Sequence, residues 1–230
     1  MNHFKQKIFF NSHLLNEANG WKLLGNFLIL AGLFSFSGCS FLKTRDLPKA
    51  YKISVSRETT EKTQKGEFDS IVIEVLPFSS NKPFDSTLIQ ILGDNKVWKE
   101  DYYNRIFISP DILISQDLRK WLSDTEAFKN VSLPITREDT NVVIHGNVEK
   151  FFINASNPKS PASTVSLKFS VTWNDDTKIE NEVTQSFKYE SEIPIPGLKT
   201  EYVIEGLEIA LEEVFRLFEQ DLYSFLSGVM

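Results

Sequence analysis

The chain has 230 residues, of which 41% are hydrophobic and 24% are charged, and this ordinary globular usage suits one sizeable domain. The formal net charge is −6 and no stretch gathers Lys and Arg on one face, so a nucleic-acid partner is excluded by its missing electrostatic footprint. A single cysteine excludes an intramolecular disulfide and a cysteine-based zinc site.

The first 40 residues have the pattern of a lipoprotein export signal. Three lysines precede an uncharged run, rich in Leu and Phe, over residues 23–36. The run leads into Phe36-Ser37-Gly38-Cys39-Ser40, which resembles the lipobox that lipoprotein signal peptidase cuts. We therefore expect residues 1–38 to be a cleaved signal peptide. Cys39 then becomes the lipidated N-terminus of a short tether over residues 39–48.

Two features of this segment depart from the usual pattern. Phe36 stands where a lipobox prefers Leu, and the basic region before Leu23 is long and contains Glu17, which suggests an over-extended translation start. The alternative is an uncleaved membrane anchor, because residues 23–42 are uncharged and a spanning helix needs about 20 such residues. Gly, Ser and Asn dilute this run, which favours cleavage. In both cases we expect the remaining chain to lie outside the cytoplasm.

Two strands are predicted after the tether. Apolar and polar residues alternate over Tyr51–Ser56, and β-branched residues recur over Ile71–Phe78. The charged segment Arg57–Phe68 between them is expected to be an exposed loop. Residues 79–97 contain Pro, Gly and Asn without a clear period, so no element is predicted there.

A helix is predicted to begin at Pro110 and to end near residue 125. Ser109 is a suitable N-cap, Pro110 suits the first helical position, and Asp111 lies beside the positive end of the helix dipole. Apolar residues at helical spacing then form one face: Ile114, Leu118, Trp121 and Leu122.

The clearest pattern in the chain is a hairpin that follows a strand over residues 141–153. That strand places on one side Val142, Ile144, Val148 and Phe152. In the first strand of the hairpin, five apolar residues alternate with Thr, Ser and Lys: Val165, Leu167, Phe169, Val171 and Trp173. A turn over residues 174–177 leads into a second strand that ends near Tyr189. We expect an antiparallel pair with one face in solvent.

A long amphipathic helix is predicted from about Lys199 to Phe225, after an extended connector over residues 193–197. Its apolar stripe consists of Val203, Leu207, Ala210, Leu211, Val214, Leu217, Phe218, Leu222 and Phe225. Residues 49–230 are therefore expected to form a single α+β domain. Its two layers are a mainly antiparallel sheet and two amphipathic helices on one face of that sheet.

The order of these segments resembles the ABC-type transport auxiliary lipoproteins, the PqiC-like family. The resemblance rests on the lipobox, the strand Ile71–Val75, the segment Val143–Phe151, the hairpin and the final helix. In that family a Tyr-x-x-x-Trp-x-x-Pro segment commonly opens the first helix. Here Tyr103 and Pro110 keep that pattern, whereas Phe107 replaces the Trp.

The resemblance implies a non-catalytic component of an envelope lipid-transport system. Such a component would be tethered to the outer membrane, would face the periplasm, and would have an MCE-domain protein and ABC transporter components as partners. Ser40 after the cysteine looks like the version that is sorted to the outer membrane in enteric bacteria. A second copy of the chain is a further expected partner, and no cofactor or metal is implied.

Aromatic residues are the candidates for contacts with a partner or with lipid: Trp98, Tyr102, Tyr103, Phe107 and Phe151. The first four lie just before the predicted helix at Pro110, and aromatic residues are enriched in binding hot spots. Phe151 is next to Phe152 in one strand, so one of the two rings has to leave the main core. The alternative interpretation is that these residues fill the core.

Two other functions are alternatives to this one. A structural or assembly-factor lipoprotein that contacts outer-membrane proteins is the main alternative, and a periplasmic hydrolase is a weaker one. His145 is the only histidine after the signal, and its place in a strand beside Gly146 favours a structural role over catalysis. The sequence contains no Gly-x-Ser-x-Gly elbow, phosphate-binding loop or His-Glu-x-x-His helix, so we expect no enzymatic activity.

Overall fold

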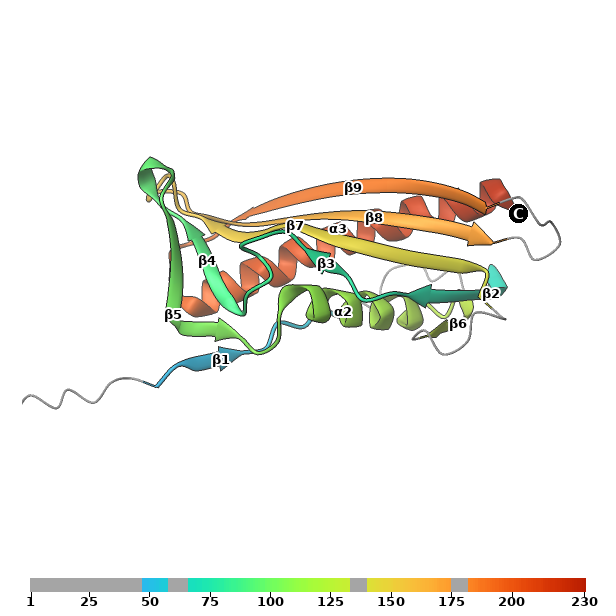
Figure 1. Cartoon of the computed structure of the whole chain (residues 1–230), viewed down its shortest axis with the longest axis horizontal. Helices are drawn as coiled ribbons and strands as arrows, with labels where there is room; N and C mark the ends of the chain where they lie inside the picture. The colour runs from blue at the N-terminus through green and yellow to red at the C-terminus, as the bar shows by residue number, and fades with distance from the viewer. Residues whose placement is uncertain (1–46, 58–65, 133–139, 175–181) are drawn as a thin grey trace, which may run out of the picture. The chain divides into compact units, whose positions relative to one another are not determined.

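A computed structural model describes residues 47–57, 66–132, 140–174 and 182–230, and residues 47–230 form one compact unit (Figure 1). Residues 1–38, Cys39 and most of the tether lie outside the described residues. The strands are β1 (Lys49–Tyr51), β2 (Phe68–Val75), β3 (Ser79–Ser80), β4 (Leu88–Leu92), β5 (Trp98–Ile106), β6 (Phe128–Ser132), β7 (Val142–Asn154), β8 (Ala162–Asn174) and β9 (Glu182–Pro194). The helices are α2 (Pro110–Asp124), α3 (Thr200–Val229) and a single 3-10 turn, η1 (Asp94–Lys96).

The centre of the sheet consists of the long antiparallel strands β7, β8 and β9, which the sequence predicted. β8 pairs with β7 from Ala162 to Trp173, and with β9 from Ala162 to Asn174. The turn predicted at residues 174–177 lies almost wholly outside the described residues. The long regular ladders form because apolar and polar residues alternate without interruption from Thr164 to Trp173 of β8.

The other edge of β7 pairs with three short strands in succession. β2, β3 and β4 run parallel to β7 beside residues 142–144, 147–148 and 153–154. Pro77 and Pro83 interrupt this part of the chain, which explains why it forms short strands. The nine-stranded sheet is therefore mixed: its long pairings are antiparallel, as predicted, and the short strands add parallel pairings.

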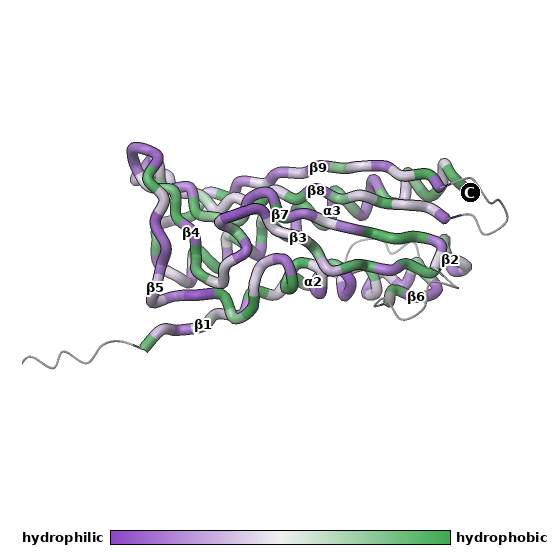
Figure 2. The backbone as a smooth tube through the Cα atoms, in the orientation of Figure 1, coloured by the Kyte–Doolittle hydropathy of each residue, from purple (hydrophilic) through white to green (hydrophobic). Residues whose placement is uncertain are grey.

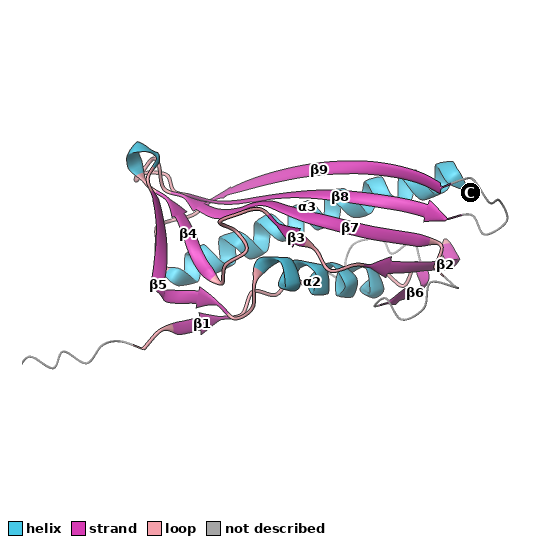
Figure 3. Ribbon diagram, viewed as in Figure 1, coloured by secondary structure: helices cyan, strands magenta, loops and turns pink. Residues whose placement is uncertain are grey.

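Both helices lie on one face of the sheet, which confirms the predicted two-layer α+β arrangement (Figures 1 and 3). The predicted face of α2 is buried, and so is the stripe of α3, with Leu217 only partly covered. Phe169 of β8 stacks on Phe218 of α3 with ring centroids 4.0 Å apart. On the same side, Gly146 leaves room for the ring of Phe78, because a Cβ at Gly146 would overlap that ring.

The segment over residues 52–57, here named the strap, corrects the strand predicted at Tyr51–Ser56. Only Lys49–Tyr51 forms a strand, although Ile53 and Val55 are buried as the alternation indicated. The Ser54 amide donates to Glu208 Oε1 at 3.0 Å, and the Val55 amide donates to Asp117 Oδ2 at 3.1 Å. Carboxylates of α3 and α2 thus accept the backbone N–H groups that a neighbouring strand would accept in a sheet.

The strap ends at a buried ion pair. Arg57 donates to both carboxylate oxygens of Glu219 on α3, at 3.2 and 3.0 Å. The indole N–H of Trp121 on α2 donates to the same carboxylate at 2.7 Å. A buried carboxylate needs such compensation for its lost hydration, so this contact fixes the strap and both helices to one point.

The outer face of the sheet is less open than predicted. Lys168 is exposed and Ser170 is half-buried, but Thr164 and Ser166 are buried. The reason is a second set of aromatic side chains that covers the outer face near the start of β8. Phe152 pairs with Thr164 across the strands and lies beneath Phe84 and Trp98.

Candidate functional site

Three exposed aromatic residues, Trp98, Tyr102 and Tyr103, belong to a β hairpin at one end of the sheet, here named the arm (Leu88–Ile106). β4 and β5 pair antiparallel from Leu92 and Trp98 onward, with η1 at the tip. Leu92 also pairs with Asn154 at the end of β7, so the arm is continuous with the main sheet. Figure 2 shows that β5 is largely hydrophilic along its backbone, as expected for a strand with little core contact.

One edge of the arm is open along part of β5. β1 pairs with β5 only at residues 104–106, and no other described strand pairs with residues 98–103 on that side. Backbone N–H and C=O groups at an open edge can accept an additional strand from another molecule.

Trp98, beside the tip of the arm, caps an aromatic cluster on the outer face of the sheet. Its ring contacts Phe152 and Phe84 edge-on, with centroid distances of 5.1 and 5.9 Å. Phe84 and Phe152 are buried, whereas Trp98 keeps 45% of its surface exposed. Trp98 is therefore rigidly supported on one side and available for contact on the other, which is the usual condition of a hot-spot residue.

A shallow depression of about 720 Å³ lies beside Trp98, and its lining residues include Pro83, Lys99 and Tyr102. At its base, the buried Gln90 side chain donates to Glu100 Oε1 at 3.2 Å and to the Leu88 carbonyl at 3.3 Å. These bonds hold the side chain of Glu100 on this face. The depression thus combines a flat aromatic wall with a fixed carboxylate.

A bulge in β5 places the two tyrosines outward. The register with β4 shifts between Leu88 and Ile89, so residues 102–104 have no paired partner on β4. The Asp101 carboxylate accepts the backbone N–H groups of Tyr103 and Asn104, both at 3.0 Å. Figure 1 shows that β5 turns sharply along its length. Tyr102 and Tyr103 remain 67% and 55% exposed.

Four of the five predicted contact residues are thus grouped on or next to β5. Phe107 follows the strand directly, is 70% exposed, and has its backbone N–H bonded to the Tyr51 carbonyl at 2.8 Å. The prediction that Phe151 contacts a partner or lipid is wrong, because this residue is only 3% exposed and belongs to the core. A bulge between Val148 and Lys150 reverses the faces of the following residues, so Phe152 is the ring that leaves the helix side.

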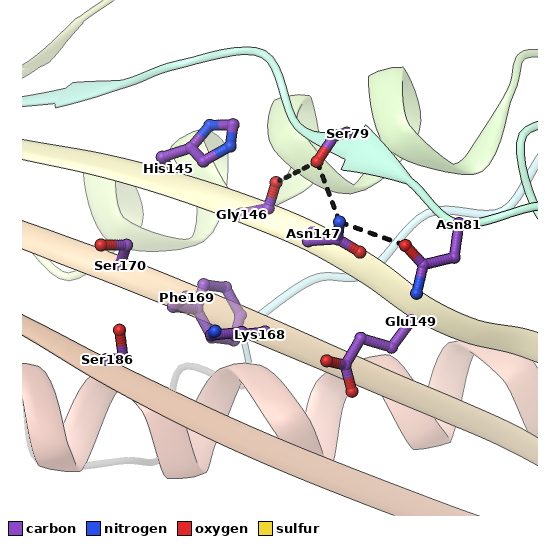
Figure 4. A pocket seen from close by; sticks show the side chains of 10 residues that line it. All are labelled: Ser79, Asn81, His145, Gly146, Asn147, Glu149, Lys168, Phe169, Ser170 and Ser186. Atoms are coloured by element: carbon purple, nitrogen blue, oxygen red, sulfur yellow. Dashed lines mark hydrogen bonds between the residues drawn. The ribbon is translucent and has the colours of Figure 1, made fainter.

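A second, polar surface lies on the outer face of β7, β8 and β9 around His145 (Figure 4). It is an open groove of about 350 Å³. Asn147 Nδ2 donates to Ser79 Oγ at 3.1 Å, and Ser79 Oγ bonds to the Gly146 carbonyl at 3.4 Å. His145 pairs across the strands with Ser170.

This groove lacks the arrangement of a hydrolase triad within the described part of the chain. No hydrogen bond or ion pair joins His145 to a described Ser, Asp or Glu. Glu149, which lines the groove, forms an ion pair with Lys188, and the hydrogen bond that Lys188 donates to Glu149 raises the pKa of Lys188. Among the described residues, no group of His, Cys, Asp and Glu is placed to hold a metal ion.

Other acidic side chains have a raised pKa because of their burial and contacts within the fold. Burial raises the pKa of Asp117, which accepts the Val55 amide, and burial also raises the pKa of Tyr223 in α3. Burial and the hydrogen bond to Asp221 raise the pKa of Tyr189. These groups contact the helices, and none of them lines the arm or the groove. The helices of the described residues include none that is long and apolar enough to cross a bilayer.

Comparison with known proteins finds similarity in structure but not in sequence. No family model and no curated protein matches the sequence. The crystal structure of a Xanthomonas campestris protein of the DUF330 family is similar, with a TM-score of 0.63 and 16% identity over 79% of this chain and 99% of that chain. The crystal structure of an uncharacterized protein gives a TM-score of 0.54 and 9% identity, over 69% of this chain and 95% of that chain. We conclude that this chain shares the fold of the Xanthomonas DUF330 protein.

Proposed function

We propose that the chain is a lipid-anchored auxiliary component of an ABC/MCE-type lipid transport system and that it acts by binding a protein partner. The observation that carries the proposal is the lipobox at Cys39, followed after a short tether by a domain with the DUF330 fold. This combination fits the PqiC-like resemblance of the sequence. The protein then sits at the outer membrane and faces the periplasm.

The arm is the surface on which we place the protein partner. Trp98 and Tyr102 offer an exposed aromatic contact, and both line the depression that contains Glu100. The open edge at residues 98–103 allows a strand of an MCE-domain protein, or of a second copy, to extend the sheet. Main-chain bonds would supply affinity, and the aromatic residues would supply the hot spot.

The proposal also assigns no catalysis to this chain. A hydrolase would need a nucleophile and a base within hydrogen-bond reach. The described hydroxyls that line the polar groove are those of Ser79, Ser170 and Ser186; Ser79 bonds to the Gly146 carbonyl and to Asn147, and none of the three bonds to the His145 ring. The serines and His145 are better explained as cross-strand neighbours on a hydrated face.

A pull-down from native membranes tests the proposal. The wild-type protein should recover MCE-domain and ABC transporter components. Tyr102→Ala should weaken this association by about 2 kcal/mol, the usual threshold for a hot spot. Val183→Ala is the matched control, because Val183 is also exposed but pairs with Trp173 at the opposite end of the sheet.

Two other results would contradict the proposal. Recovery of outer-membrane proteins in place of transporter components would favour the assembly-factor alternative. Recovery of no envelope protein, together with a hydrolase activity that disappears in His145→Ala, would assign the chain to enzymes.

A further inference from the structure

The tether enters the domain beside the end of β5, at the corner where residues 104–106 pair with β1. β1 runs parallel to β5, with Lys49 beside Asn104, Ala50 beside Arg105 and Tyr51 beside Ile106. Lys49 lies ten residues after Cys39 in the sequence. Ten residues span at most about 33–36 Å when fully extended. A lipid group on Cys39 would therefore hold this corner close to the bilayer.

The corner presents an aromatic and basic face on the side of β5 away from the core. Ile106 is buried and Asn104 is half-buried, whereas Tyr103, Arg105 and Phe107, which alternate with them along the chain, are exposed. Ala50 lies beside Arg105 in the sheet, and its small side chain leaves the guanidinium accessible. We name Ala50, Tyr103, Arg105 and Phe107 the strip.

The chemistry of the strip matches a phospholipid surface. Aromatic residues concentrate at membrane interfaces, where the ring lies among the headgroups. Arg105 is exposed and forms no ion pair with a described residue, so its charge is available to lipid phosphate. The nearby Asp101 carboxylate accepts three hydrogen bonds from Tyr103 and Asn104, which reduces its repulsion of phosphate.

We infer that the strip rests on the phospholipid membrane to which the chain is anchored. This inference depends on the acylation of Cys39 in the proposed function. Trp98 and Tyr102 line the depression on another part of the arm and remain free for the protein partner. The same hairpin then holds the domain against the bilayer and presents its open edge to the periplasm.

Short-range quenching by brominated phospholipids tests the contact in the full acylated protein. The protein is reconstituted into vesicles of phosphatidylethanolamine and phosphatidylglycerol, with or without bromine on the acyl chains. Phe107→Trp places a reporter in the strip, and this exposed position tolerates a larger ring. Val183→Trp is the matched control at the far end of the sheet. The emission of the wild-type tryptophans is subtracted.

Brominated lipid should remove most of the added emission of Phe107→Trp and little of that of Val183→Trp. Adding Arg105→Glu to Phe107→Trp should reduce the quenching, because Glu would repel the anionic headgroups. Mass spectrometry of the same samples reports the acyl mass on Cys39.

The remaining outcomes separate the two proposals. If Cys39 carries acyl mass but neither reporter is quenched, the domain stands away from the bilayer and only the docking inference fails. Equal quenching at both positions would also overturn it, because the domain would then lie flat along its length. Absence of acyl mass on Cys39 would overturn both the anchoring and the docking.

Discussion

Replacing Thr164 by Val should stabilise the domain. Thr164 is on the covered part of the outer face of β8, is 2% exposed, and its Oγ1 has no hydrogen-bond partner among the described residues. A buried polar group without a partner costs about 1–3 kcal/mol. The methyl group that replaces the hydroxyl adds apolar burial of about 0.8 kcal/mol. Because Val keeps the shape of Thr, we expect the free energy of unfolding to rise by about 1 kcal/mol or more.

Thr172→Val is the matched control for this prediction. Thr172 lies on the same face of the same strand, but its hydroxyl bonds to Thr184 Oγ1 at 2.9 Å. Its replacement should therefore give no gain, or a loss of about 0.5–1 kcal/mol. Urea unfolding measures both variants, and a change of 1 kcal/mol shifts Tm by about 2–4 °C in a domain of this size. Equal losses in the two variants would show that the Thr164 hydroxyl is satisfied, and the reasoning would be refuted.

Three further predictions concern the core, the strap and the anchor. Phe169→Ala should lower the free energy of unfolding by about 3–5 kcal/mol in urea, because it removes a buried ring that stacks on Phe218; a loss below 1 kcal/mol would contradict the two-layer core. Burial raises the folded-state pKa of Asp117, so its contribution to stability is greatest below about pH 4, the unfolded pKa, and falls as pH rises through the folded value. Asp117→Asn should remove this slope from urea titrations between acid and neutral pH, and an unchanged slope would assign it to another group. Cys39→Ala should abolish labelling by a fatty-acid probe, and labelling that persists would exclude Cys39 as the acylated residue.

The sequence was sufficient to predict a helix or strand where one hydrophobic period continues over many residues. β8 and the helices α2 and α3 each bury one regular face, and their predicted bounds differ from the observed ones by only a few residues. β9 is mostly exposed and continues to Pro194, beyond the predicted end near Tyr189 and into the segment predicted as a connector. The grouping of Trp98, Tyr102, Tyr103 and Phe107 was also visible in the sequence, because these residues are neighbours in one segment.

The rest depended on contacts that leave no period in the sequence. β5 is largely exposed over residues 98–105 and buries only Ile106, so apolar and polar residues do not alternate along it, and β3 has only two residues. The strap alternates like a strand, but its partners are carboxylates more than 60 residues away in the chain. Phe151 and Phe152 exchanged their expected roles because a bulge of one residue reverses every face that follows it.

The strap also determines how the domain responds to tension. If Cys39 is acylated as proposed, a pull from the membrane would reach the domain at Leu47, and the first resistance would be the short pairing of β1 with β5. Beyond it, the load would pass through the strap to Asp117, Glu208 and Glu219, which belong to the two helices. The pull would thus be shared between the arm and the helix layer.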